Sequence, residues 1–93
     1  MKIKINDKLK GINDEDLNVT VKDVIIQSLL SPVQEDKQED KWLKYEIYKK
    51  VKEAVSEVDL KTEQITIIKK AIGKFQPPLI LGQTFEIIEN GNG

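Results

Sequence analysis

The first twenty residues alternate polar and apolar side chains over two short stretches. Lys2 to Ile5 place Ile3 and Ile5 on one face, and Leu17 to Val19 repeat the alternation. A period of two residues is typical of a half-buried β-strand. The two stretches are separated by residues that tolerate tight or left-handed turns: Asn6, Asp7, Gly11, Asn13 and Asp14. The pattern predicts an antiparallel hairpin of these two strands, with Leu9 or Ile12 as candidates to extend the pairing.

A helix start follows the second strand. Thr20 stands at an N-cap position, and Asp23 three residues later gives the spacing of a capping box, with Asp in place of Glu. The Ser31-Pro32 step ends the helix, because proline disfavours helical backbone at the residue before it. We therefore predict a helix over residues 21–30, whose buried stripe consists of Val21, Val24, Ile25, Ser28 and Leu29.

A densely charged segment precedes a second helix. Residues 34–41 contain six charged side chains and no apolar one, which is typical of a mobile loop or of an exposed first helical turn. After Lys41 the chain becomes amphipathic with helical spacing. We predict a helix over residues 40–57, with a buried stripe of Leu43, Ile47, Val51, Ala54, Val55 and Val58.

The only tryptophan and tyrosines of the chain form a second face on this helix. Trp42, Tyr45 and Tyr48 follow one another at intervals of three residues. One interpretation is an aromatic platform for a partner or for a nucleotide base. The other is a wider buried face that packs under the hairpin.

The stretch from Val58 to Gln64 predicts the start of a third helix, with Leu60 placed to act as a hydrophobic staple. Gly73 near its end and the Gln76-Pro77-Pro78 sequence after it mark the stop. The predicted core stripe of this helix consists of Ile65, Ile68, Ala71, Ile72 and Phe75.

A last helix is predicted over residues 79–89, because Pro78 suits a first helical turn. Gly82 lies in its interior and costs about 1 kcal/mol relative to alanine. Either another backbone approaches closely there, or the helix begins later; residues 79–81 alone are also compatible with a short strand. The apolar positions of this segment are Ile80, Leu81, Phe85, Ile87 and Ile88.

These elements predict an α+β fold, mostly helical, in which a short N-terminal antiparallel β-hairpin packs against about four α-helices. A two-stranded hairpin is marginal by itself, so its apolar face must lie against the helices or a second subunit. At 93 residues the chain suits a single domain, which we place at residues 1–89, with a disordered tail at 90–93.

The amino-acid composition limits the catalytic and metal-binding chemistry that the chain can perform. The chain has fifteen lysines and no arginine, histidine or cysteine. It therefore lacks a side chain that titrates near neutral pH, a thiolate nucleophile and a Cys/His zinc site. The acidic triplet Asp14-Glu15-Asp16 lacks the spacing of a calcium loop and indicates a solvated turn. We expect a protein that is not an enzyme and has no cofactor or metal.

Charge and hydropathy argue against nucleic acid or a membrane as the main partner. The formal charge is −1 and the sequence pI is about 5.5. The lysines at 49, 50, 52, 69 and 70 are interpreted as solvated helix surface. No stretch approaches the roughly 18 apolar residues that span a bilayer, and no signal sequence is evident at the N-terminus. These features predict a location in the cytoplasm.

Four local patterns occur in a fixed order along the chain: Leu17-x-Val19-Thr20-x-x-Asp23-Val24, Lys44-Tyr45-x-Ile47, Val58-Asp59-Leu60 followed by Glu63-x-Ile65, and Pro78-Leu79-x-x-Gly82-Gln83-x-Phe85-Glu86-Ile87-Ile88-Glu89. Over nearly the whole chain this order resembles small, mostly uncharacterised proteins of tailed bacteriophages and prophages. The resemblance implies a viral accessory protein in the host cell. Such proteins often occupy a host protein, bind DNA or sequester a small signal.

Three functions remain open. The first is a non-enzymatic module that binds a protein, forms a homo-oligomer and counters a host system. The second is a nucleic-acid-binding regulator, and the third sequesters a nucleotide signal. The candidate residues for partner binding are Trp42, Tyr45, Tyr48, Lys49, Lys52 and Phe85.

Overall fold

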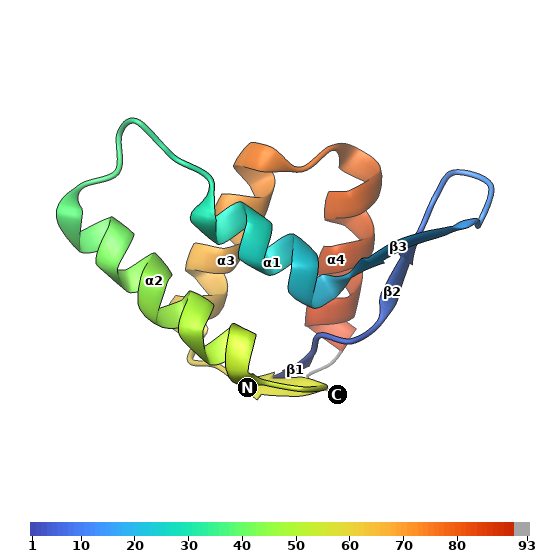
Figure 1. The fold of residues 1–93 in the computed structure, drawn as a ribbon, viewed down its shortest axis with the longest axis horizontal. Coiled ribbons are helices and arrows are strands. Elements are labelled where there is room, and N and C mark those ends of the chain that lie inside the picture. Colours follow the sequence, from blue (N-terminus) through green and yellow to red (C-terminus); the bar gives the residue numbers. More distant parts are fainter. Residues whose placement is uncertain (91–93) are drawn as a thin grey trace.

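Helix α1 (Val21–Leu30) lies at the centre of the molecule (Figure 1). The computed structural model describes residues 1–90 of the chain. Its elements are β1 (Lys2–Lys4), β2 (Lys8–Lys10), β3 (Asp16–Thr20), α1 (Val21–Leu30), α2 (Gln38–Glu53), β4 (Glu57–Asp59), α3 (Thr62–Phe75) and α4 (Pro78–Asn90). Figure 1 shows α2 at one edge and the β2–β3 hairpin at the opposite edge, with α1 between them. The predicted α+β class, mostly helical with an N-terminal hairpin, is confirmed.

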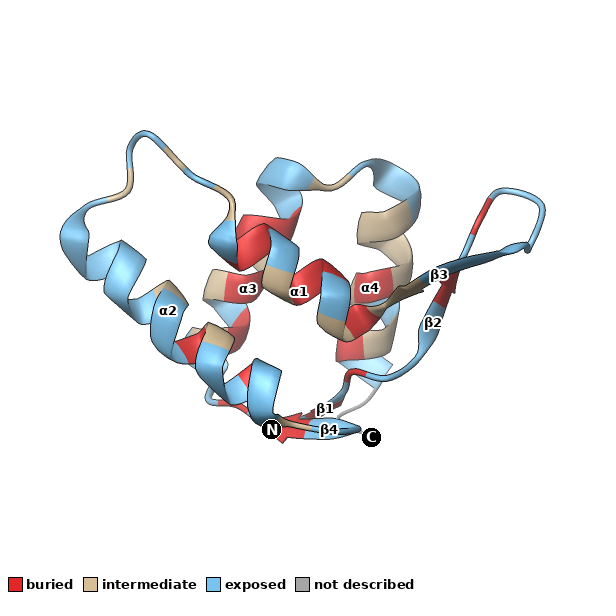
Figure 2. Ribbon diagram, in the orientation of Figure 1, coloured by how far each residue is buried: buried red, intermediate tan, exposed pale blue. Residues whose placement is uncertain are grey.

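The capping box predicted for α1 is present. The Asp23 backbone N–H donates to Thr20 Oγ1 at 3.2 Å, and the Thr20 N–H donates to Asp23 Oδ2 at 3.0 Å. The helix spans residues 21–30, as predicted, and Ser31 caps its end. Its buried stripe contacts α2, α3 and α4. In Figure 2 the buried parts of α1 and α3 lie where the helices meet.

The N-terminal strand pairs with a segment far along the chain, which corrects the predicted pairing of residues 2–5 with residues 17–19. Strand β1 lies antiparallel to β4, with Ile3 opposite Val58. Both of these side chains are buried. The flanking pairs are Lys2 with Asp59 and Lys4 with Glu57, and opposite charges across a strand pair are favourable. The N-terminal ammonium group also donates to Asp59 Oδ1 at 3.0 Å.

The N-terminal hairpin keeps the predicted second strand, 17–19, within β3 and has a different first strand. Strand β2 supplies its first strand and pairs with β3, with Lys8 opposite Thr20. Leu9 is buried, whereas Ile12 is 84% exposed, so Leu9 is the residue that extends the apolar face. Asp14 adopts a left-handed conformation with a φ of 60°, as a turn of this composition requires.

Helix α2 starts and ends earlier than predicted. It occupies residues 38–53 instead of 40–57, so the charged residues from Gln38 onward form its exposed first turn. The chain becomes extended at Ala54 and continues into β4. Val55 is therefore exposed, and Val58 is buried on a strand instead of a helix. Leu43 was also predicted to be buried and is exposed.

Helix α3 begins at Thr62, within the stretch 58–64 that was predicted to mark its start, and Lys61 is its N-cap. The Lys61 N–H donates to Gln64 Oε1 at 3.0 Å, the half of a capping box that the third helical residue supplies, while the Lys61 side chain offers no acceptor to the helix N-terminus. Leu60 and Ile65 are both buried at the spacing of a hydrophobic staple. Phe75 was predicted to be in the core, but it is exposed at the end of α3, beside Val33 of the loop between α1 and α2.

Helix α4 runs from Pro78 and includes Leu79 to Leu81, so the alternative of a strand there is wrong. Asn90 is its last residue, and the remaining predicted tail, 91–93, lies outside the described residues. Neither explanation offered for Gly82 holds, because the helix begins early and a Cβ at Gly82 would have no neighbour within 4 Å. Within residues 1–90, no helix is long and apolar enough to cross a membrane.

A lysine from α1 caps the end of α2. Lys22 Nζ donates to the carbonyl oxygens of Lys52 and Ala54, both at 2.8 Å. Carbonyls at a helix C-terminus have no partner in their own helix, and a cation is favourable there. Lys22 therefore ties α2 to α1 at one end.

Replacement of Lys22 by methionine should lower the free energy of unfolding by about 1 kcal/mol, because the α2 carbonyls lose a charged donor while the aliphatic stem is kept. Urea unfolding followed by circular dichroism measures this. Lys70→Met, at an exposed position of α3, is the matched control and should change stability by less than about 0.5 kcal/mol. Equal effects of the two substitutions would contradict the capping role.

Gly82→Ala should raise the free energy of unfolding by about 1 kcal/mol, because alanine has the higher helix propensity and the added methyl group enters open space. Thermal unfolding by circular dichroism measures the change. Gly73→Ala in α3, where a Cβ also has no neighbour within 4 Å, should act in the same direction. A loss of stability at Gly82 alone would contradict the open environment described for it.

Candidate functional site

The first half of α2 stands away from the core. None of residues 38–46 is buried, and the helix is anchored by Ile47 and Val51 in its second half. Residues 38–41 are all polar, so the first turn has no apolar side chain to bury, and the apolar residues that follow it are exposed as well. Two aromatic side chains are consequently left in solvent: Trp42 is 61% exposed and Tyr45 is 45% exposed.

The aromatic side chains of α2 form a continuous row. The ring centroids of Trp42 and Tyr45 are 5.8 Å apart with an interplanar angle of 30°, and those of Tyr45 and Tyr48 are 6.0 Å apart with an angle of 40°. Lys52 Nζ lies 5.8 Å from the centroid of the Tyr48 ring and covers that end of the row. Of the two interpretations, the exposed platform fits Trp42 and Tyr45, while Tyr48 packs against the core.

Lysines accompany these rings. Lys41, Lys49 and Lys52 lie on the same face by helical spacing, and none of them forms an ion pair within residues 1–90. Three glutamates lie along one edge of this lysine-bearing face. They follow one another at seven-residue intervals: Glu39, Glu46 and Glu53. We call the exposed face formed by Lys41, Trp42, Tyr45, Tyr48, Lys49 and Lys52 the aromatic–lysine stripe.

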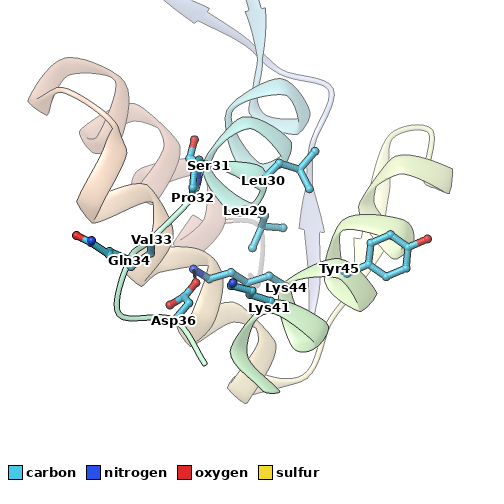
Figure 3. Close-up of a pocket in the computed structure, with 10 residues that line it drawn as sticks. All are labelled: Leu29, Leu30, Ser31, Pro32, Val33, Gln34, Asp36, Lys41, Lys44 and Tyr45. Atoms are coloured by element: carbon cyan, nitrogen blue, oxygen red, sulfur yellow. Dashed lines mark hydrogen bonds and ion pairs between the residues drawn. The ribbon is translucent and has the colours of Figure 1, made fainter. Parts of the chain in front are cut away.

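A cleft of about 720 Å³ opens beside this stripe. It lies between the end of α1, the loop that follows α1, and the first half of α2 (Figure 3). Its walls are mostly apolar, with Leu30 53% exposed. The lining residues are Leu29, Leu30, Ser31, Pro32, Val33, Gln34, Asp36, Lys41, Lys44 and Tyr45.

An ion pair spans the cleft. Lys44 Nζ donates to Asp36 Oδ2, and the two side chains are only 13% and 15% exposed. Figure 3 shows the Lys44 side chain reaching from α2 toward Asp36 on the loop. Because the Asp36 charge is already neutralised by Lys44, Lys41 leaves the cleft with a net positive charge.

A second hollow, of about 560 Å³, adjoins the cleft. It is lined by Gln38, Lys41, Trp42 and Tyr45, so Lys41 and Tyr45 belong to both. The cleft and the aromatic–lysine stripe therefore form one continuous surface.

The structure brings five of the six sequence-predicted candidates together. Trp42, Tyr45, Tyr48, Lys49 and Lys52 all lie on α2, as their spacing required. Phe85 does not join them: it is half-buried on α4, and Lys69 Nζ lies 5.4 Å from the centroid of its ring.

The sequence patterns did not predict the aliphatic wall of the cleft. A signal was present, because Leu30 is apolar but lies outside the buried stripe predicted for residues 21–30. Leu29 is buried, whereas Leu30 is exposed and lines the cleft together with Pro32 and Val33.

The two carboxyl groups with lowered pKa values, Asp16 and Asp59, lie outside the cleft. The backbone N–H of Asn18 and the nearby Lys8 hold the pKa of Asp16 below its usual value. The N-terminal ammonium group lowers the pKa of Asp59 in the same way, through a hydrogen bond and its charge. Neither group lines the cleft. Within residues 1–90, no cluster of three or more acidic side chains could hold a metal ion.

Comparisons of the chain with protein-family models, with curated proteins and with solved structures gave no match.

The Asp36–Lys44 pair should stabilise the cleft measurably. A double-mutant cycle with Asp36→Asn and Lys44→Met should give a coupling energy of about 1 to 2 kcal/mol, because both groups are largely withdrawn from water. The control is the pair Lys8–Asp16, whose side chains are 56% and 46% exposed and which should give less than about 0.5 kcal/mol. Urea unfolding of the four variants of each cycle measures both values, and equal couplings would contradict the withdrawn geometry.

Proposed function

We propose that this protein is a non-enzymatic interaction module that binds a partner protein through the cleft. The observation that carries the proposal is the continuous exposed apolar surface from Leu30 to Tyr45 and Trp42, which borders two hollows. Monomeric proteins rarely leave large apolar side chains clustered in this way without a binding role. Tryptophan and tyrosine are also enriched among residues that dominate binding energy at protein interfaces.

The arrangement of the rings favours a protein over a nucleic acid. Tyr45 stands between Trp42 and Tyr48, and Lys52 covers the far side of Tyr48. Single-stranded nucleic acids bind by stacking bases on free ring faces, and here Tyr45 lies between two rings while Lys52 lies over Tyr48. The aliphatic wall of the cleft, with Leu30 and Val33, would likewise give no specific contact to a phosphate backbone.

The chemistry of the cleft indicates what the partner carries. Apolar walls accept an aliphatic or aromatic side chain, and the unpaired ammonium group of Lys41 favours a carboxylate beside it. A partner segment with an apolar residue next to Asp or Glu therefore fits best.

The biological role that we propose rests on the sequence resemblance alone. The pattern from Pro78 to Glu89 supports an accessory protein of a phage or prophage that acts in the cytoplasm of the host cell. Within that role, occupation of a host protein, and through it interference with a host system, is the activity that the cleft supports best.

The test separates the cleft from exposed apolar surface in general. Chemical crosslinking with mass spectrometry in an extract of expressing cells would identify candidate partners, each of which is then purified and titrated by calorimetry. Leu30→Asp should weaken binding at least tenfold, because it places a charge on the apolar wall and beside the partner's carboxylate. Ile12→Asp is the matched control, since Ile12 is 84% exposed on the hairpin and far from the cleft in sequence and fold.

Equal affinities of the Leu30 and Ile12 variants for the purified partner would refute the cleft as the binding site. Binding of duplex or single-stranded nucleic acid at near-physiological salt, with no purified protein bound, would favour the nucleic-acid alternative instead. A shift in melting temperature with one member of a panel of nucleotides would favour the nucleotide-sequestering alternative.

A further inference from the structure

We propose that the aromatic–lysine stripe is covered by the same stripe of a second copy of this chain, with the two α2 helices antiparallel. The stripe is chemically polarised along the helix. Its two most exposed rings, Trp42 and Tyr45, lie in the first half of α2, and Lys49 and Lys52 lie exposed in the second half. An antiparallel partner therefore brings lysines to the rings and rings to the lysines.

The register follows from the spacing. A two-fold axis level with residue 47 places Trp42 opposite the second copy's Lys52, and Tyr45 opposite the second copy's Lys49, because the members of each pair are equally far from residue 47. The symmetry repeats both contacts, so each of the four exposed side chains has a complementary neighbour. Interfaces of this kind are self-complementary by construction.

The contact chemistry already occurs within the chain. Lys52 lies over the Tyr48 ring, and Lys69 lies over the Phe85 ring. A lysine ammonium group is attracted to the face of an aromatic ring, and the aliphatic stem of lysine covers apolar surface at the same time. Glu39 and Glu46 lie about one turn on either side of Trp42 and can accept the ammonium group of the incoming lysine.

The same polarity disfavours a parallel pair. Parallel helices in register would place Lys49 and Lys52 against their own copies, and such like-charge contacts are unfavourable. The position of α2 permits an approach by a second copy, because the helix lies at one edge of the molecule (Figure 1).

Lys41 and Tyr45 belong to both the cleft and the stripe, so a dimer would share them between the two. The aliphatic wall of Leu30, Pro32 and Val33 stays outside the seam. The proposal goes beyond the binding function and does not depend on it.

Sedimentation equilibrium of the purified chain, from micromolar to millimolar concentration, tests the proposal. We expect a monomer–dimer equilibrium that weakens as salt is raised. Lys49→Glu combined with Lys52→Glu should weaken dimerisation at least tenfold. Lys50→Glu combined with Lys70→Glu introduces the same change of charge at exposed positions outside the stripe and should leave the equilibrium within about twofold.

A mixing experiment tests the register itself. Trp42→Lys combined with Tyr45→Lys should also abolish self-association, because lysines would then face lysines. A mixture of this variant with the Lys49→Glu, Lys52→Glu variant should form a heterodimer, since the introduced lysines of one face the introduced glutamates of the other. Circular dichroism checks that both variants stay folded. If the aromatic variant unfolds, the two lysine variants alone still decide the question.

A wild-type chain that stays monomeric at millimolar concentration, equal weakening by the two pairs of lysine substitutions, or a monomeric mixture of folded variants would each overturn the proposal. None of these results would bear on the cleft, whose test uses Leu30 and a purified partner. Conversely, failure of Leu30→Asp to weaken partner binding would leave the dimer proposal intact.

Discussion

The burial of α1 is the interaction on which the rest of the structure depends. Five of its ten residues are buried, and its stripe contacts α2, α3 and α4, so it is the helix that connects the others. A helix with so wide an apolar face is stable only when neighbours cover it. Asp23 and Thr20 fix where the helix starts. Lys22 connects α1 to the end of α2 by donating a hydrogen bond to the Lys52 carbonyl oxygen. Removal of α1 would leave the remaining helices without a common core.

The candidate site is a consequence of how α1 ends. Pro32 turns the chain away after Leu30, and the loop to α2 is long enough to hold the two helices apart at that end. The space between them becomes the cleft, and the Asp36–Lys44 pair bridges it. Burial of α2 begins at Ile47, so the residues before it are free to contact a partner. The same geometry that leaves these side chains outside the core therefore provides the surface that we propose for binding.

Sequence patterns predicted the features that local chemistry determines. Residues 21–30 were placed correctly because a capping box and a proline mark both ends, and the row from Trp42 to Tyr48 followed from helical spacing alone. The pairing of β1 with β4 was missed because each strand has three residues and one buried side chain, too little to identify a partner far along the chain. The helical period of residues 43–58 continued past the true end of α2, so Val55 and Val58 were assigned to a helix. The cleft depends on how two helices diverge, which no local pattern encodes.

The position of Trp42 makes it a fluorescent probe of the candidate surface. It is the single tryptophan of the chain, and it lies on the exposed row of rings instead of in the core. Its intrinsic fluorescence therefore reports on the environment of the candidate surface more directly than on the packed interior around α1. The protein carries a native optical probe for whatever approaches α2.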